Sequence, residues 1–159
     1  MNYSDVSTGE EFEQYVMGLF RLVGLNVSDT PPTNEYGADL IIESNYRYAV
    51  QCKFYSRAVG IKAIQEVIGA LTYYNCDYGI VVTNDSFTQQ ACNLADSNNV
   101  LLVDGKKLNE FSERPEDIEK CLSEFTETSS HAKHSTNQPD EYWTVNDLVI
   151  RYGVSKDKI

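Results

Sequence analysis

The sequence predicts an α/β protein in which a mixed central sheet of about five strands is flanked by helices. Three strand-like segments follow one another between residues 25 and 54 without a helix between them. Two helix-strand units come next, at residues 61–83 and 86–103. Strands joined by short loops pair antiparallel, whereas strands joined through a helix pair parallel. The sheet is therefore expected to be antiparallel in its first part and parallel in its second part, with helices on both faces.

The first predicted helix begins after Thr8, which forms a capping box with Glu11. Apolar residues then recur at helical spacing until Gly24 ends the helix. These residues are Phe12, Val16, Leu19, Phe20 and Val23. Glu13 borders this apolar stripe, so its carboxylate can point toward the sheet. The alternative is that Glu13 is an ordinary solvated helix carboxylate.

A turn-rich loop separates the first two predicted strands. Residues 25–28 form a short strand, and the two prolines in residues 29–36 keep that loop out of the sheet. Gly37 permits a tight turn into the second strand. The second strand is then joined to the third, residues 47–54, by a short hairpin turn.

A polar pair interrupts the apolar third strand. Gln51 and Lys53 lie on one face of it, because side chains alternate along a strand. A buried lysine and glutamine cost several kcal/mol unless charged or hydrogen-bonding groups meet them. Asp39, at the head of the preceding strand, can supply such a group. An aspartate, a second oxygen ligand and a lysine at strand ends are what metal-assisted cleavage of a phosphodiester requires.

Two helix-strand units complete the predicted sheet. The helix at residues 61–74 presents an apolar stripe, made of Ile61, Ile64, Val67, Ile68 and Leu71. The continuous apolar runs at residues 78–83 and 100–103 are typical of strands that are buried on both faces. Ser86 and Gln89 are expected to form a capping box for the second helix.

Composition limits the classes of function. The chain has 159 residues and a net charge of −11, which argues against DNA binding along its whole surface, because such binding comes from Lys and Arg. The four cysteines are widely spaced without a CxxC pair, which argues against a zinc cluster or a disulfide framework. No apolar run approaches the ~20 residues of a membrane span, and the N-terminus lacks the features of a signal peptide. The cytoplasm is therefore the expected location, without a membrane partner.

Asp39 followed by Gln51-Cys52-Lys53 resembles the motif of the PD-(D/E)xK nucleases. The resemblance is closest to the catalytic domain of Mrr-type restriction endonucleases, in which Gln often replaces the acidic residue. Four further segments lie in the order typical of that family: GEEFE at 9–13, IQEVIGAL at 64–71, GIVVTNDSFT at 79–88 and VLLVDGKKL at 100–108. The resemblance covers about residues 8–108 and implies the restriction-endonuclease-like, three-layer fold.

The resemblance also implies a divalent-metal-dependent DNA endonuclease of the restriction and defence type, with Mg²⁺ or Mn²⁺ as cofactor. Asp39, Gln51 and Glu13 would be metal ligands together with the backbone carbonyl of Cys52, and Lys53 would stabilise the transition state. Because Gln51 brings no charge, metal affinity is expected to be weak, and Glu13 can supply the missing carboxylate. A salt bridge between Lys53 and Asp39 without chemistry is the alternative for the lysine.

Other polar residues near the motif have weaker assignments. Arg57 and Lys62 form a basic cluster shortly after Lys53 and are expected to contact DNA phosphates. Gln65 and Glu66 are interpreted as a solvated helix face, with support of the site as the alternative.

Double-stranded DNA is the expected partner. Cutting both strands with one site per chain suggests a homodimer, and the acidic surface suggests a separate DNA-recognition domain or subunit. Two alternatives remain open: a nuclease of the same fold that resolves branched DNA such as Holliday junctions, and a catalytically degenerate nuclease fold that acts as an interaction module.

The chain is expected to divide into three parts. Residues 1–125 are interpreted as the nuclease domain, with its core at residues 8–108. Residues 126–140 lack apolar periodicity and are interpreted as a polar linker. Residues 141–159 resemble the first half of a helix-turn-helix, and a C-terminal amphipathic helix that seals the core is the alternative.

Overall fold

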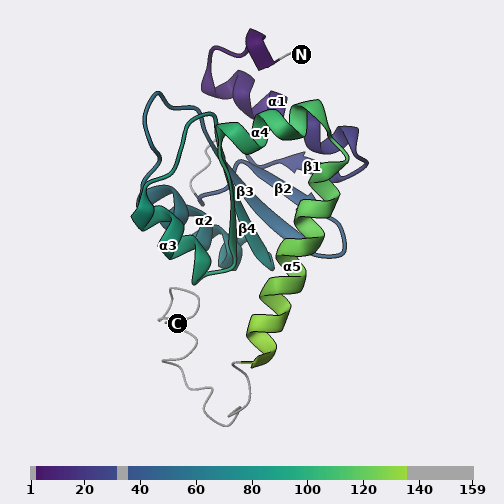
Figure 1. Ribbon diagram of the computed structural model, residues 1–159, viewed down its shortest axis with the longest axis vertical. Helices are drawn as coiled ribbons and strands as arrows, with labels where there is room; N and C mark the ends of the chain where they lie inside the picture. The colour runs from purple at the N-terminus through teal and green to yellow at the C-terminus, as the bar shows by residue number, and fades with distance from the viewer. Residues whose placement is uncertain (1–2, 32–35, 136–159) are drawn as a thin grey trace.

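The computed structural model describes residues 3–31 and 36–135, with side chains up to residue 129 (Figure 1). A five-stranded sheet lies between two layers of helices, which confirms the predicted three-layer α/β fold. The elements are η1 (Tyr3–Asp5), α1 (Gly9–Leu22), β1 (Asn26–Asp29), β2 (Leu40–Glu43), β3 (Arg47–Lys53), α2 (Ile61–Tyr73), β4 (Tyr78–Thr83), α3 (Gln89–Asp96), β5 (Val100–Val103), α4 (Gly105–Glu113) and α5 (Asp117–Ser135).

The strands follow one another across the sheet in the order β1-β2-β3-β4-β5. The β1-β2 and β2-β3 pairs are antiparallel, whereas the β3-β4 and β4-β5 pairs are parallel. This is the mixed sheet that the order of hairpin and helix-strand units predicts. Leu40 lies opposite Val50 in the β2-β3 register, and Lys53 lies beside Thr83 in the β3-β4 register.

Each face of the sheet packs against its own helices (Figure 1). Apolar residues of α1, α4 and α5 cover one face, where they meet Leu40, Val50 and Ile80. Apolar residues of α2 and α3 cover the other face, where they meet Ile41 and Val81. Every residue of β4 is buried, as the continuous apolar run at residues 78–83 predicts.

The start of α1 differs in one detail from the predicted capping box. The hydroxyl of Thr8 accepts a hydrogen bond from the backbone N–H of Glu11, as predicted. The carboxylate of Glu11, however, accepts from the backbone N–H and the hydroxyl of Ser7. The helix ends before Gly24, whose φ of 88° lies in the left-handed region that glycine tolerates.

Two local predictions on the α2 and α3 side are wrong. The N-cap of α3 is Thr88, whose hydroxyl accepts from Ala91 N–H, whereas the predicted cap Ser86 donates to the carboxylate of Asp85. Ile61, predicted to lie in the buried stripe of α2, is 42% exposed, and burial begins at Ala63.

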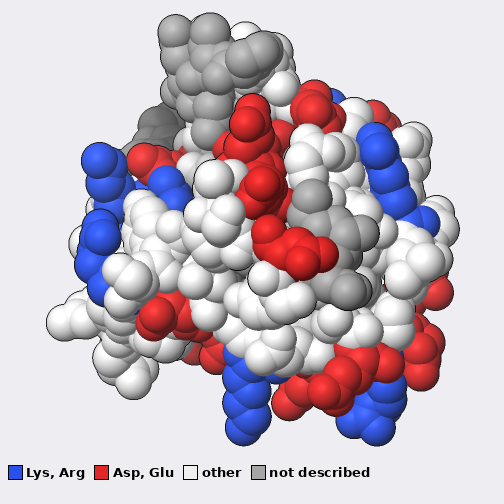
Figure 2. Space-filling model, turned by 90° about the horizontal axis from the view of Figure 1, so that it is seen from above, with Lys and Arg blue, Asp and Glu red and all other residues white. Residues whose placement is uncertain are grey.

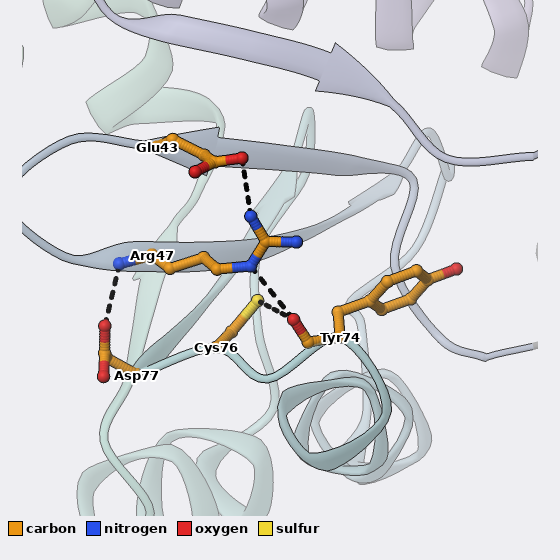
Figure 3. Close-up of polar contacts among 5 residues, drawn as sticks. All are labelled: Glu43, Arg47, Tyr74, Cys76 and Asp77. Atoms are coloured by element: carbon orange, nitrogen blue, oxygen red, sulfur yellow. Dashed lines mark hydrogen bonds and ion pairs between the residues drawn. The ribbon is translucent and has the colours of Figure 1, made fainter.

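A polar network surrounds Arg47, the first residue of β3 (Figure 3). Its guanidinium lies 2.6 Å from the carboxylate of Glu43 and donates to the carbonyl of Tyr74 at 3.0 Å. Its backbone N–H donates to Asp77, and the thiol of Cys76 lies against the same Tyr74 carbonyl. This network joins the β2-β3 hairpin to the segment between α2 and β4.

α5 continues through Ser135, so residues 126–135 of the predicted polar linker are helical. Thr126 and Ser129 are buried although they are polar. The division into three parts stays a prediction, and the helix-turn-helix-like segment at residues 141–159 lies outside the described residues. No helix in the described part of the chain combines the length and the apolar character needed to cross a bilayer.

Candidate active site

Asp39 immediately precedes β2 and faces the end of β3. Its backbone N–H donates to the carbonyl of Val50 at 2.7 Å, and its Oδ2 accepts from the backbone N–H of Cys52 at 2.8 Å. The carboxylate therefore takes the place of a backbone acceptor at the end of the sheet ladder. The residue is only 6% exposed. A fixed, buried carboxylate thus lies where the polar motif of β3 begins.

Gly37 determines how closely the chain that leads to Asp39 approaches α2. Its φ is 87°, and a Cβ at this position would lie 2.1 Å from the backbone carbonyl oxygen of Glu66. A side chain at residue 37 would therefore collide with α2. The approach fixes the entry to β2 against the middle of that helix.

Glu13 lies on α1, and its carboxyl group contacts the carboxylate of Asp39. Burial raises the pKa of the Glu13 carboxyl to about 7, and the charge of Asp39 and a hydrogen bond with Asp39 add to the rise. Two carboxyl groups in contact resist simultaneous ionisation. The predicted orientation of Glu13 toward the sheet is therefore correct, and the pair would accept a cation readily.

Gln51 and Lys53 share the α2 face of β3, as the strand alternation predicts. The Gln51 amide nitrogen donates to Oε1 of Glu66 at 3.0 Å, and Nζ of Lys53 lies 3.0 Å from the same oxygen. Burial disfavours the Lys53 ammonium, but the hydrogen bond and charge of Glu66, followed by Tyr55 and Asp39, outweigh it and raise the pKa of Lys53. Lys53 thus stays charged within reach of the Asp39 carboxylate.

Cys52 points to the opposite face, where it packs against the core that contains Phe12. Burial raises the pKa of its thiol well above the usual value, and the charges of Asp39 and Glu13 add to this effect. The side chain is therefore a poor nucleophile, and only the backbone of Cys52 faces the site.

A hollow of about 150 Å³ adjoins the site; it is lined by Lys53, Tyr55, Arg57, Lys62 and Glu66, among others, and is called the basic hollow below. The guanidinium of Arg57 lies over the ring of Tyr55, 4.5 Å from its centroid. The hollow therefore carries more positive than negative side chains. On the face drawn in Figure 2, Asp and Glu side chains run across the middle, and Lys and Arg side chains lie toward the edges beside further Asp and Glu.

Asn84, at the end of β4, holds the chain that forms the basic hollow. Its amide accepts from the backbone N–H of Tyr55 and donates to the carbonyl of Tyr55, both at 2.8 Å. The side chain thus joins the end of β4 to the backbone that follows β3. The segment after Lys53 therefore leaves the sheet along a defined path.

The structure brings every predicted site residue into one region: Glu13, Asp39, Gln51, the Cys52 backbone, Lys53, Arg57 and Lys62. Glu66 was interpreted mainly as solvated, yet it contacts two of these residues. Its spacing contained a signal, because Glu66 lies three residues after Ala63 and four before Ala70, both of which are buried. A carboxylate with that spacing borders the buried face of its helix.

The oxygen atoms at this site suit a hard divalent cation. Among residues 3–31 and 36–129, no three side chains of His, Cys, Asp and Glu are grouped so as to hold a metal ion. A metal here would therefore rely on the carboxylates of Asp39 and Glu13 with neutral oxygens from Gln51 and the Cys52 backbone. The raised pKa of Glu13 supports this fit, since a cation would relieve the repulsion between the two carboxylates.

Solved structures with the same fold include two of note. The "DNA modification-dependent restriction endonuclease AspBHI" has a TM-score of 0.53 and 21% identity, over 74% of this chain and 35% of that chain. The "Protein of Unknown Function AF1548" has a TM-score of 0.50 and 18% identity, over 57% of this chain and 54% of that chain. The chain thus spans about half of the second protein and about a third of the first.

The comparison with protein families gives a direct assignment. None of the curated proteins compared with the chain matches it. Residues 5–112, however, match the Mrr catalytic-domain family, which is described as "Restriction endonuclease". This range contains β1 to β5 and every predicted site residue. The chain belongs to the Mrr-type restriction endonuclease catalytic-domain family.

Proposed function

We propose that the chain is a divalent-metal-dependent DNA endonuclease that hydrolyses phosphodiester bonds, with Asp39, Glu13, Gln51 and Lys53 as its catalytic residues. One observation carries the proposal. A buried carboxylate, Asp39, is fixed against the backbone of β3, and both the Glu13 carboxyl and the Lys53 ammonium lie within its electrostatic reach. Two acids and a lysine that converge from separate segments have no role in the apolar core, and family membership supports a nuclease.

The proposed site residues have three different roles: metal binding, charge stabilisation and phosphate binding. Asp39, Glu13, Gln51 and the carbonyl of Cys52 would hold Mg²⁺ or Mn²⁺, which supplies Lewis acidity and lowers the pKa of water. The charge of Lys53 would stabilise the negative charge that develops on the phosphorus oxygens and would orient the attacking water. The basic hollow, through Arg57 and Lys62, would bind a neighbouring phosphate of the substrate strand.

Double-stranded DNA is the proposed substrate, bound locally rather than along the acidic surface. A net charge of −11 opposes extended contact with phosphates. We therefore assign recognition of sequence or modification to another domain or subunit. The partial coverage of AspBHI, a modification-dependent enzyme, is consistent with this division. A homodimer would allow one site to cut each strand.

The test is cleavage of methylated and unmethylated plasmid in Mg²⁺ or Mn²⁺, with Asp39→Asn and Lys53→Ala beside the wild type. Asn keeps an oxygen that can accept the Cys52 N–H, so Asp39→Asn removes charge with little change in shape. We expect the wild-type protein to cut and both variants and EDTA-treated protein to be inactive. Cleavage that persists in Asp39→Asn would refute the assignment of the site, and faster cutting of a four-way junction would favour a resolvase.

A non-catalytic interaction module is the second candidate. It is favoured by the neutral Gln51 and by the lack of a group of three acidic, His or Cys ligands among the described residues. Calorimetry with millimolar Mg²⁺ and Mn²⁺ separates the two candidates. Saturable binding that Glu13→Gln weakens supports the nuclease, whereas no heat of binding supports the module.

A further inference from the structure

One oxygen atom of Glu66 contacts both polar side chains of the β3 motif. Oε1 lies 3.0 Å from the Gln51 amide nitrogen and 3.0 Å from Nζ of Lys53. The side chains of Lys53 and Glu66 are 20% and 32% exposed, and Gln51 is 3% exposed. These contacts are partly shielded from water and are therefore stronger than exposed ones.

The contact with Glu66 determines which way the Gln51 amide faces. A carboxylate can only accept hydrogen bonds, so the amide nitrogen must face Glu66 and the amide oxygen must face away from it. The oxygen is the atom that a metal ion would need. A neutral amide has no charge to orient it toward a cation. Another side chain must therefore keep the amide oxygen of Gln51 facing the metal position.

The backbone also ties Glu66 to the metal-binding side of the site. The close approach of Gly37 to the carbonyl of Glu66 joins α2 directly to the segment that carries Asp39. Any shift of α2 at this point would move the entry to β2. The backbone of Glu66 is therefore held close to the segment that leads to Asp39.

We propose that Glu66 is a positioning residue, which holds the Gln51 amide and the Lys53 ammonium in their working orientations through a single carboxylate oxygen. The inference rests on the proposed nuclease function and extends it to a residue that acts through Gln51 and Lys53. Glu66 would act through its two neighbours, because both the Gln51 amide nitrogen and the Lys53 ammonium engage its Oε1.

The experiment compares Glu66→Gln with Glu43→Gln. Gln at residue 66 keeps the shape but can donate as well as accept, so it no longer fixes the Gln51 amide. Glu43 is the matched control, because it also pairs with a cation of β3, but at the other end of the strand. We expect Glu66→Gln to lower kcat by about 10-fold to 100-fold with little change in KM for DNA, and to weaken Mg²⁺ binding in calorimetry. Glu43→Gln should change neither quantity.

Two further measurements separate positioning from a merely structural role. The side-chain amide protons of Gln51, observed by NMR without metal or DNA, should exchange faster with water in Glu66→Gln than in Glu43→Gln. In a Gln51→Ala background, Glu66→Gln should weaken Mg²⁺ binding much less than in the wild type, because the residue through which it acts is gone.

The outcomes distinguish this inference from the proposed function. Equal Mg²⁺ affinity and equal amide exchange in Glu66→Gln and Glu43→Gln would overturn the positioning role even if the wild type cleaves DNA. Fully additive effects with Gln51→Ala would also overturn it. If the wild type cuts no DNA, the proposed function fails, while metal affinity and amide exchange still decide whether Glu66 positions Gln51.

Discussion

β3 carries a cation at each end, and the surroundings of these two cations differ. At its first residue, Arg47 pairs with Glu43 in an open setting, where the two side chains are 35% and 57% exposed (Figure 3). At its last residue, Lys53 pairs with Glu66, where the two side chains are 20% and 32% exposed. The same strand thus contains a solvated ion pair and a partly buried ion pair.

The two ends of β3 differ more in the charges around the cation than in the exposure of the ion pair. Arg47 binds acceptors through its guanidinium and its backbone N–H, and together these join the hairpin to the end of α2. Around Lys53, the carboxyl groups of Glu66 and Asp39 both attract the ammonium, and Glu13 contacts Asp39 with its pKa raised to about 7 by burial and by Asp39. Crowding of carboxyl groups in a partly buried place, rather than an ion pair as such, distinguishes the end of the strand that we propose to be functional.

The largest expected effect is loss of cleavage in Lys53→Ala. Removal of the cation leaves the developing charge of the transition state without its partner, so kcat should fall about 100-fold to 1000-fold. Plasmid cleavage in Mg²⁺ measures the effect. Lys120→Ala, which removes an exposed lysine of α5, is the control and should cleave as the wild type does. Equal activity in the two variants would show that Lys53 is not catalytic. The two ends of β3 would then not differ in function.

Arg47→Ala should lower the stability of the protein and leave its cleavage activity unchanged. It removes the donor to the Tyr74 carbonyl and the partner of Glu43, so the free energy of unfolding should fall by about 2 kcal/mol. Cleavage at a temperature where the variant stays folded should be unchanged. Urea unfolding followed by circular dichroism gives the first quantity. Lost activity with unchanged stability would contradict the structural role of this end.

Glu13→Gln should remove one source of the pH dependence of stability in the metal-free protein. The carboxyl has a pKa of about 7 when folded, compared with the ordinary glutamate value of 4.5, so the folded state holds its proton more tightly. The wild type should therefore lose stability as the pH rises from about 4.5 to about 7, by on the order of 1 kcal/mol after allowance for solvent screening. Glu13→Gln should remove this loss.

Thermal unfolding at pH 5 and pH 8 in EDTA measures that difference. Millimolar Mg²⁺ should stabilise the wild type at pH 8 more than it stabilises the variant, because the wild type gains a ligand and loses a repulsion. A wild type that is equally stable at both pH values, relative to the variant, would show that neither burial nor Asp39 raises the pKa of Glu13 in the folded protein.

Sequence patterns were sufficient for the sheet because its signals are local. Alternation along the strand placed Gln51 and Lys53 on one face, and the hairpin followed by helix-strand units predicted the antiparallel and parallel parts of the sheet. The length of α5 was missed because its buried face contains Thr126 and Ser129, which carry no apolar period. Their small size, rather than their polarity, suits them to the buried face of α5.

The site was only partly predictable for a different reason. The motif residues lie close in sequence, so their faces follow from the strand itself. The contacts of Glu66 depend on how far α2 is rotated over the sheet, and that rotation depends on the approach of Gly37 to the helix backbone. The spacing within residues 61–74 places Glu66 at the border of the buried face, but it does not show which side chains of β3 Glu66 contacts.

The smallest expected effect belongs to Glu43→Gln. The carboxylate is more than half exposed, so water and salt screen its attraction to Arg47, and the free energy of unfolding should fall by about 0.5 kcal/mol or less. Arg47 retains the Tyr74 carbonyl, which is why this change should cost less than Arg47→Ala. Urea unfolding at low and high NaCl measures it, and the difference from the wild type should shrink as salt is added. A loss as large as that of Arg47→Ala, unaffected by salt, would mean that the open end of β3 is as tightly coupled electrostatically as the site around Lys53.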